Sequence, residues 1–290
     1  QIFGVTAKFV PNEFINFLGR ERITDVQLGD QTEREVTVLF SDIRDYTSLS
    51  EALSPEDTFR LVNAYNRRMG PVIQANHGFV NQYLGDAIMA IFPKSPADAL
   101  QAAVDMQRTL EAYNQERIPK GWPAIQIGIG MHSGKLIMGI IGDKNRMDAA
   151  TIADTVNTSA RIESLTKHYG ANILISGESL AKIEHQSVFH FRNLGKVKVK
   201  GKQVPTEVFE CYDGDGADQK ALKMQTAEAF QMALSLYHAK AFAEAAVEFK
   251  KILQLNPEDR VGDFFFKKAT KNAYEGVSED WTGVEMMENK

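Results

Sequence analysis

The fold is decided by a short apolar stretch near the start of the chain, Val36-Thr37-Val38-Leu39-Phe40, which ends in Ser41-Asp42. β-Branched and aromatic residues favour strands, and an unbroken apolar run of this length indicates a buried one. The polar pair that follows marks the end of the strand. We therefore predict a central strand from Glu35 onward, with the carboxylate of Asp42 at its tip.

Helix caps, hairpin signals and apolar spacing predict the elements around this strand. Ser54-Pro55-Glu56-Asp57 supplies an N-cap, a proline at the first helical position and acids in the first turn, so a helix is expected as far as Ile73. Apolar runs over 79–83 and 87–92 flank Leu84-Gly85-Asp86, which predicts a β-hairpin with Asp86 in its turn. Later elements, in chain order, are a helix over 98–116, strands over 125–131 and 136–141 around His132-Ser133-Gly134-Lys135, a helix over 153–169, a strand over 173–176 and a hairpin over 197–211.

This order of elements predicts an α+β fold, in which helices pack on one ferredoxin-like mixed sheet. The sheet domain is expected over 34–213, after an N-terminal connector over 1–33. An Ala-rich composition predicts a small all-α tail over 214–290. The tail resembles one tetratricopeptide-like repeat at Ala229, Leu236, Tyr237, Ala245, Phe249, Leu253, Asn256 and Pro257. A single repeat buries its own face poorly, so we expect the tail to lean on the sheet domain or on a partner.

Composition excludes several classes of protein. The 290 residues are 43% hydrophobic with a formal charge of −5, so the chain is neither disordered nor basic enough to indicate a nucleic-acid partner. Cys211 is the single cysteine, which rules out an internal disulfide and fits the cytoplasm. No apolar stretch is long enough for a membrane helix. Because the chain opens at Gln1 rather than Met, we expect a longer protein with an upstream sensor or membrane region.

Four short motifs carry the chemistry. They are Phe40-Ser41-Asp42-Ile43-Arg44, Tyr83-Leu84-Gly85-Asp86-Ala87, Gly130-Met131-His132-Ser133-Gly134, and Asp154-Thr155-Val156-Asn157 with Arg161. Their order and spacing resemble the catalytic domain of class III adenylyl and guanylyl cyclases, over about residues 34–212. The resemblance implies a lyase that converts a nucleoside triphosphate to a cyclic nucleotide and pyrophosphate.

Asp42 and Asp86 are the candidate metal ligands. Carboxylates at a strand tip and in an adjacent hairpin turn can converge on hard divalent cations, which prefer carboxylate and phosphate oxygens. Two Mg²⁺ or Mn²⁺ ions fit a mechanism in which one lowers the pKa of the ribose 3′-hydroxyl and the other neutralises the triphosphate. By resemblance, Ile43 offers its backbone carbonyl to the same ions. An isolated pair of aspartates would be read as solvated turn acids, but the surrounding motifs favour ligands.

The third predicted helix carries the other candidate catalytic residues. Asn157 and Arg161 are four residues apart and therefore share one face of this helix. The resemblance implies that Asn157 holds the ribose and that Arg161 stabilises charge building on the α-phosphate. By resemblance Lys200 binds the terminal phosphates, and Lys135 is a weaker phosphate candidate. Without the motifs, these cations would be read as ordinary surface residues. His132 is expected to be a packed or turn-stabilising residue rather than a general base.

Base recognition rests, by resemblance, on Gln82 and Ala150. Adenylyl cyclases usually have Lys and then Asp or Thr at these positions, whereas guanylyl cyclases usually have Glu and a small residue. The Gln82 amide can pair with either base and Ala150 adds nothing polar, so discrimination should be blunted. Thr151 restores an acceptor if the loop shifts by one residue. We favour ATP because Arg146-Met147-Asp148 resembles bacterial adenylyl cyclases, with GTP or dual use as the alternative.

The resemblance also implies the assembly. In the family, the aspartates come from one subunit and the Asn and Arg from the other, so a head-to-tail homodimer with two equivalent sites is expected. Rotation of the subunits would give an upstream sensor control over the site. A catalytically silent module that binds nucleotide or only dimerises stays open as an alternative. A diguanylate cyclase or two-metal polymerase would need a Gly-Gly-Asp/Glu hairpin, and Leu84-Gly85-Asp86 is not one.

Overall fold

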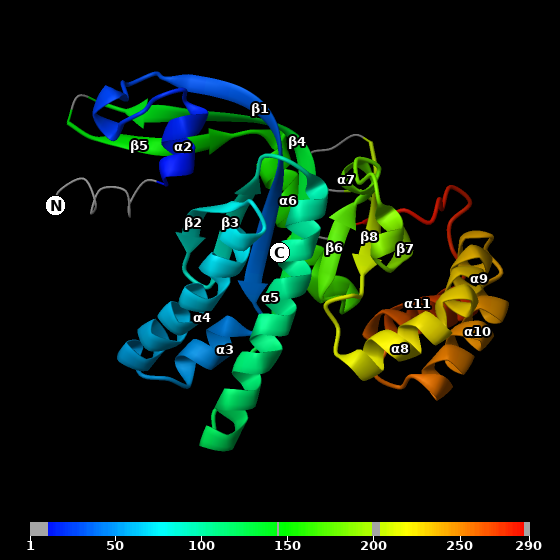
Figure 1. Cartoon of the computed structure of the whole chain (residues 1–290). Coiled ribbons are helices and arrows are strands. Elements are labelled where there is room, and N and C mark those ends of the chain that lie inside the picture. The colour runs from blue at the N-terminus through cyan, green and yellow to red at the C-terminus, as the bar shows by residue number, and fades with distance from the viewer. Residues whose placement is uncertain (1–10, 144, 199–203, 287–290) are drawn as a thin grey trace.

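The computed structural model describes residues 11–143, 145–198 and 204–286. Within them the strands form one mixed sheet in the order β2-β3-β1-β4-β6-β8-β7-β9, and β5 pairs with the far end of β4 (Figure 1). The strands are β1 Gln31–Ile43, β2 Phe79–Leu84, β3 Ala87–Phe92, β4 Ile127–Gly142, β5 Met147–Ile152, β6 Ile173–Ser176, β7 Phe191–Lys198, β8 Thr206–Cys211 and β9 Glu285–Met286. The fold class predicted from the sequence is confirmed.

Helices cover both faces of the sheet and continue beyond it as the tail. They are α2 Asn12–Phe17, α3 Tyr46–Glu51, α4 Pro55–Ala75, α5 Pro96–Arg117, α6 Asp154–Tyr169, α7 Gly177–Leu180, α8 Ala217–Gln225, α9 Ala227–His238, α10 Phe242–Leu255 and α11 Arg260–Glu275. The predicted cap of α4 is present, since the Ser54 hydroxyl accepts a hydrogen bond from the backbone N–H of Asp57 at 3.1 Å. The predicted helices over 98–116 and 153–169 correspond to α5 and α6.

β1 divides the core into two layers by the alternation of its side chains. Leu39 and Ile43 join a cluster with α4 and α5 on one face. Val38 and Phe40 join a second cluster on the other face, to which α2 and α6 contribute. Side chains two residues apart share a face, so Asp42 points to the α6 face whereas Thr37 points to the α5 face. This parity decides which functional residues can meet.

The prediction of two separate strands around His132-Ser133-Gly134-Lys135 is wrong. These residues continue β4 without interruption, and all four pair with β1, whose register with β4 runs from Gln31↔Gly139 to Ile43↔Ile127. Gly134 serves close packing instead of a turn: a Cβ there would lie 2.5 Å from the Thr155 hydroxyl oxygen of α6. The sequence also gave no prediction of β5, α8 or β9.

The N-terminal segment and the tail both share the core of the sheet. Phe14 and Phe17 are buried in the same cluster as Val38 and Phe40. On the far side, Phe264 and Phe265 of α11 lie 4.9 and 5.9 Å from Tyr169 of α6, centroid to centroid. The tail therefore packs directly on the C-terminal end of α6. Its likeness to a tetratricopeptide repeat and the domain boundaries at 33 and 213 stay predictions.

A buried ion cluster joins the tail to the sheet. The Arg192 guanidinium of β7 lies 2.7 Å from the Glu210 carboxylate of β8 and 2.6 Å from that of Asp259, just before α11. Lys223 of α8 lies 2.7 Å from Glu210 and 2.6 Å from Asp215. These five side chains are almost fully buried. We call them the junction cluster.

Among the described residues, no helix combines the length and the apolar character needed to cross a membrane. Cys211 is buried at 1% exposure, as expected for a small core residue, and burial raises the pKa of its thiol well above the usual value.

Candidate active site

The two candidate metal ligands lie in one cavity. Asp42 is near the end of β1, and Asp86 occupies the tight turn between β2 and β3, where Gly85 adopts a φ of +69°. Pairing of β3 with β1, at Ser41↔Ile88, brings the turn beside the strand end. The cavity has a volume of about 180 Å³ and is lined also by Ile43, Glu163 and the loop over 44–47. The structure thus brings Asp42, Ile43 and Asp86 together.

Three carboxylates of this acidic cavity have no ion pair with a basic side chain within 4 Å among the described residues: those of Asp42, Asp86 and Glu163. Burial, together with a hydrogen bond and repulsion from Asp86, raises the pKa of Asp42 to about 7. Burial and then the charge of Asp42 raise the pKa of Glu163 to about 8. Oδ1 of Asp42 is buried with no hydrogen-bond partner among the described residues. Ionising these groups together is costly unless a cation arrives.

The residues fit divalent cations by this donor chemistry. Oxygen donors from Asp42, Ile43 and Asp86 match the preference of Mg²⁺ and Mn²⁺, and the buried oxygen of Asp42 is an orphan that a cation would satisfy. Among the described residues, no group of three or more His, Cys, Asp or Glu side chains that could hold a metal ion is found. With two aspartates as side-chain donors, coordination positions would be left for phosphate oxygens.

Asn157 and Arg161 lie on a different face of α6 from Glu163. Asn157 is exposed and Arg161 half-buried, and neither lines the acidic cavity, whereas Glu163 does. A helix turns about 100° per residue, so Arg161 points about 160° away from Glu163 around the axis. A single chain therefore does not direct this arginine toward its own aspartates.

The remaining predicted site residues are dispersed. Gln82 is exposed on edge strand β2, three places from β4 in the sheet, whereas Ala150 and Thr151 lie on β5 opposite Gly139 and Met138 of β4. Lys135 has the parity of Thr37 rather than of Asp42, and its ammonium group lies 2.9 Å from the Glu33 carboxylate. Lys200 falls outside the described residues.

His132 has a structural environment. It is buried, and its ring nitrogen Nδ1 lies 2.8 Å from the Ser176 hydroxyl of β6. This agrees with the expectation of a packed residue.

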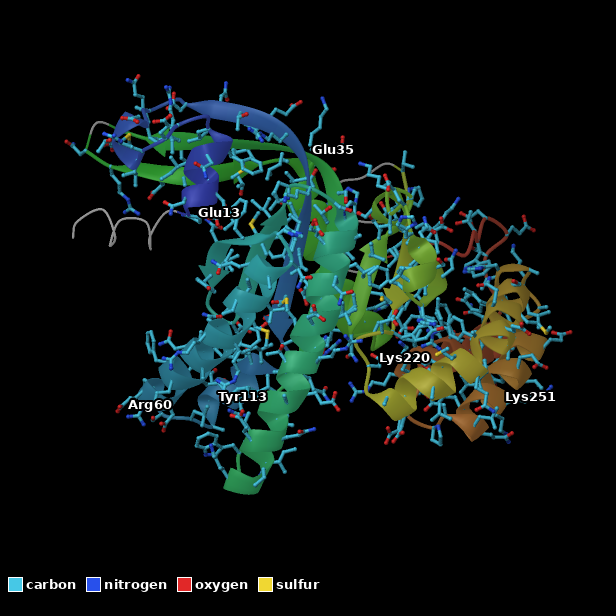
Figure 2. The ribbon with its side chains drawn as sticks, in the orientation of Figure 1. Glu13, Glu35, Arg60, Tyr113, Lys220 and Lys251 are labelled. Carbon is cyan, nitrogen blue, oxygen red and sulfur yellow. The ribbon has the colours of Figure 1, made fainter. Side chains whose placement is uncertain are left out.

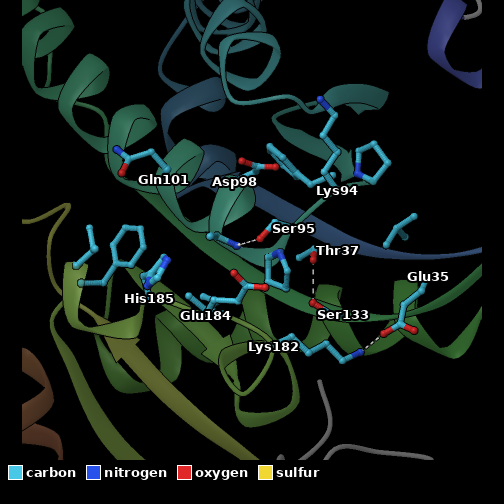
Figure 3. Close-up of a pocket in the computed structure, with 18 residues that line it drawn as sticks. Glu35, Thr37, Lys94, Ser95, Asp98, Gln101, Ser133, Lys182, Glu184 and His185 are labelled. Carbon is cyan, nitrogen blue, oxygen red and sulfur yellow. Dashed lines mark hydrogen bonds and ion pairs between the residues drawn. The ribbon is translucent and has the colours of Figure 1, made fainter.

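A larger cavity of about 700 Å³ lies on the opposite face of β1 (Figure 3). Thr37 and Ser133 form its polar floor, 2.8 Å apart, and Glu35 and Lys182 are ion-paired at one side. Its lining carries charges of both signs, and strand parity separates it from Asp42. This cavity is therefore distinct from the acidic one.

Two residues of the site escaped sequence reasoning. Glu163 is one of them. Helical periodicity could have placed it on a different face from Arg161, but periodicity does not show what that face contacts. Arg44 is the other: its guanidinium donates to the backbone carbonyls of Thr166 and Ala171 at the end of α6, although it follows the metal motif directly. Arg44 ties the loop after β1 to the end of α6, and Glu163 brings α6 into the lining of the cavity.

Comparison with known proteins identifies the family. Residues 28–212 match the family described as the adenylate and guanylate cyclase catalytic domain. The chain belongs to this family.

Relatives named as adenylate cyclases agree with this assignment. An adenylate cyclase of Anabaena cylindrica is 43% identical over 209 residues, which cover 70% of this chain and 42% of that protein. The terminal-differentiation specific adenylate cyclase of Dictyostelium discoideum is 33% identical over 274 residues, covering 92% of this chain and 13% of that protein. The chain thus spans less than half the length of these relatives.

Solved structures share the fold. The adenylyl cyclase CyaB from P. aeruginosa has a TM-score of 0.56 at 28% identity, covering 62% of this chain and 95% of that one. The guanylyl cyclase Cya2 has a TM-score of 0.54 at 31% identity, covering 64% of this chain and 94% of that one. Neighbours named for either nucleobase therefore share this architecture.

Proposed function

We propose that the chain is the catalytic part of an adenylyl cyclase, which converts ATP to 3′,5′-cyclic AMP and pyrophosphate at the interface of a homodimer. The observation that carries the proposal is the acidic cavity, where Asp42 and Asp86 converge with no ion pair within 4 Å among the described residues, while Arg161 points elsewhere. Relatives named adenylate cyclase support ATP as substrate.

The reaction is an in-line displacement. The ribose 3′-oxygen attacks the α-phosphorus, the bond from that phosphorus to the bridging oxygen breaks, pyrophosphate leaves, and the 3′-hydroxyl proton passes to solvent. When bound at Asp42, Ile43 and Asp86, two divalent cations supply acidification of the hydroxyl and neutralisation of the triphosphate. Asn157 orients the ribose, and the guanidinium of Arg161 donates to the α-phosphate oxygens as their charge builds up. Lys200 remains the candidate for the terminal phosphates.

An uncovered apolar surface supports the homodimer. The ends of β1, β4 and β5 extend as an arm away from α4 and α5 (Figure 1). One face of the arm is buried through Met138 and Ile140, while Ile137, Ile141 and Ile152 on the other face are 36%, 51% and 61% exposed. Apolar side chains gathered in this way favour association with a second protein surface. We assign that surface to a second copy.

Complementation between two inactive variants tests this function. Incubation of purified protein with ATP or GTP and Mn²⁺ should give cyclic product and pyrophosphate. Asp42→Ala/Asp86→Ala protein and Arg161→Ala protein should each be inactive, whereas their mixture should regain activity from one intact site per mixed dimer. Absence of product in the wild type, or of rescue in the mixture under conditions where mixed dimers form, would count against the proposal.

Use of GTP is the second candidate, because Gln82 carries both a donor and an acceptor. We expect Gln82→Lys to favour ATP and Gln82→Glu to favour GTP, each changing the ratio of kcat/KM values by about tenfold. Parallel assays with both nucleotides measure the ratio. Equal ratios in the two variants would show that Gln82 does not contact the base.

A further inference from the structure

Glu163 links the acidic cavity to α6, the helix that carries Asn157 and Arg161. Its carboxylate lines the cavity together with Asp42 and Asp86, and the negative charges of both repel it. No ion pair of Glu163 with a basic side chain is found within 4 Å among the described residues, although Arg44 acts on it from farther away. A cation held by the aspartates would therefore attract Glu163 as well.

Opposite faces of α6 serve different sites in the proposed dimer. Glu163 points to the cavity of its own chain, and Arg161 points about 160° away around the helix axis. If the dimer forms as proposed, Arg161 enters the site whose aspartates belong to the partner. A rotation of α6 that moves Glu163 in one site must therefore move Arg161 in the other.

α6 is seated so closely on the sheet that such a displacement would involve the whole helix. A Cβ on Gly130 would lie 2.1 Å from the backbone nitrogen of Glu163, and one on Gly128 would lie 2.1 Å from the Thr166 hydroxyl. The loop after Asp42 contacts the same helix through Arg44, whose guanidinium donates to the Thr166 carbonyl at 3.4 Å, and through an exposed ion pair of Lys167 with Asp45. Tightly packed contacts of this kind pass on small displacements rather than absorb them.

We propose that Glu163 is a positioning residue: its attraction to cations at Asp42 and Asp86 sets the orientation of α6 and so places Arg161 in the partner's site. This inference rests on the proposed dimeric cyclase. It implies that cation binding in one site supports catalysis in the other. Glu163 itself touches neither substrate nor the reacting atoms in this scheme.

Mixed dimers with one working site test the proposal. One protomer carries Arg161→Ala and a first affinity tag, and the other carries a second tag, so that tandem purification isolates the mixed species. The working site then combines the aspartates of the first protomer with Arg161 of the second. Glu163→Gln in the second protomer should lower kcat about fivefold with KM for ATP unchanged, as expected for a modest coupling between sites. The same substitution in the first protomer should change kcat less than twofold.

A double-mutant cycle tests whether the effect of Glu163 depends on the cations. When the second protomer also carries Asp42→Ala/Asp86→Ala, its α6 has lost the cations, so Glu163→Gln there should have no further effect. A full effect that persists without these aspartates, or an effect confined to Glu163→Gln in the first protomer, would overturn the proposal. Glu111→Gln, an exposed glutamate of α5, serves as the matched control.

Hydrogen exchange gives a readout that does not depend on turnover. Without nucleotide, Mn²⁺ should slow amide exchange over 154–169 in the wild type and in Glu111→Gln, but not in Glu163→Gln. Equal Mn²⁺ protection in wild type and Glu163→Gln would overturn the role of Glu163. Failure of the mixed dimer of Arg161→Ala with Asp42→Ala/Asp86→Ala to turn over would instead refute the dimeric site itself.

Discussion

The acidic cavity and the junction cluster are both groups of buried charges, but only in the junction cluster are the buried carboxylates held in short ion pairs. There, burial opposes ionisation of all three carboxyls: Arg192 and Lys223 outweigh burial and keep the pKa of Glu210 and Asp259 low, whereas burial prevails at Asp215 and raises its pKa. In the acidic cavity, burial and mutual repulsion raise the pKa of Asp42 and Glu163 instead. Figure 2 draws the side chains of the described residues on the ribbon, in the orientation of Figure 1.

The difference separates a structural cluster from a binding site. Buried charges with short ion pairs on several sides hold elements in one arrangement, and here they fix the tail to β7 and β8. Buried acids that repel one another lower the free energy of unfolding unless a bound ligand neutralises their charge. This pattern is typical of functional sites.

Removal of the two aspartates should have the largest effect, and on activity alone. Asp42→Ala/Asp86→Ala should lower cyclase activity about 1,000-fold or more, because the cations and the triphosphate lose their anchors. The free energy of unfolding without cations should not fall, because only repulsive charges are lost. Product formation and urea denaturation followed by circular dichroism measure the two effects, and a loss of several kcal/mol in stability would contradict this account.

Removal of Arg192 should have the reverse effect. Arg192→Ala leaves Glu210 and Asp259 buried without their shared cation, so the free energy of unfolding should fall by about 3–5 kcal/mol. Urea denaturation measures the loss. Arg20→Ala is the matched control, since Arg20 pairs with Asp30 at 2.7 Å but is 39% exposed, and it should cost less than about 1 kcal/mol. Similar losses of unfolding free energy in the two variants would contradict a structural role of the junction cluster.

Divalent cations should stabilise only the region that lacks compensation. At a concentration 100 times its Kd, Mn²⁺ should raise the free energy of unfolding of the wild type by about 2.7 kcal/mol. The double alanine variant should show no such gain, while Arg20→Ala should show it in full. Thermal melts with Mn²⁺ and with a chelator measure the shift, and an equal shift in the double variant would place the cation elsewhere.

The pH dependence should show the smallest effect. The folded pKa values of Asp42 and Glu163, about 7 and about 8, exceed the unfolded ones. At any pH between the unfolded and the folded pKa of each group, the native state therefore binds more protons than the unfolded state. Without cations, stability should therefore fall as pH rises from about 4 to 8. Glu163→Gln should raise the free energy of unfolding by about 1 kcal/mol at pH 8, after allowance for solvent screening, and not at all near pH 4. A stabilisation of equal size at both pH values would argue against a charge effect.

Local signals in the sequence were sufficient for the elements that hold the aspartates. β1 and the hairpin at Asp86 follow from apolar runs and a turn, all readable within a few residues. The signal at Gly134 was ambiguous, because a glycine marks either a turn or a close approach, and the approaching Thr155 is known only from the fold.

Contacts between distant residues could not be predicted in this way. Glu163 joins the cavity because α6 crosses β4 at Gly128 and Gly130, which depends on how the helix is docked. Arg192 and Asp259 are 67 residues apart in the chain, and their pairing depends on where the tail returns to the sheet.

The buried thiol of Cys211 makes the protein convenient for spectroscopy. A side chain at 1% exposure, with a raised pKa, reacts slowly with maleimides and methanethiosulfonates. A cysteine introduced at an exposed position such as Ser164 can therefore take a spin label or fluorophore with little background. In the proposed dimer, distances between labels on the two copies would then report helix movements directly in solution.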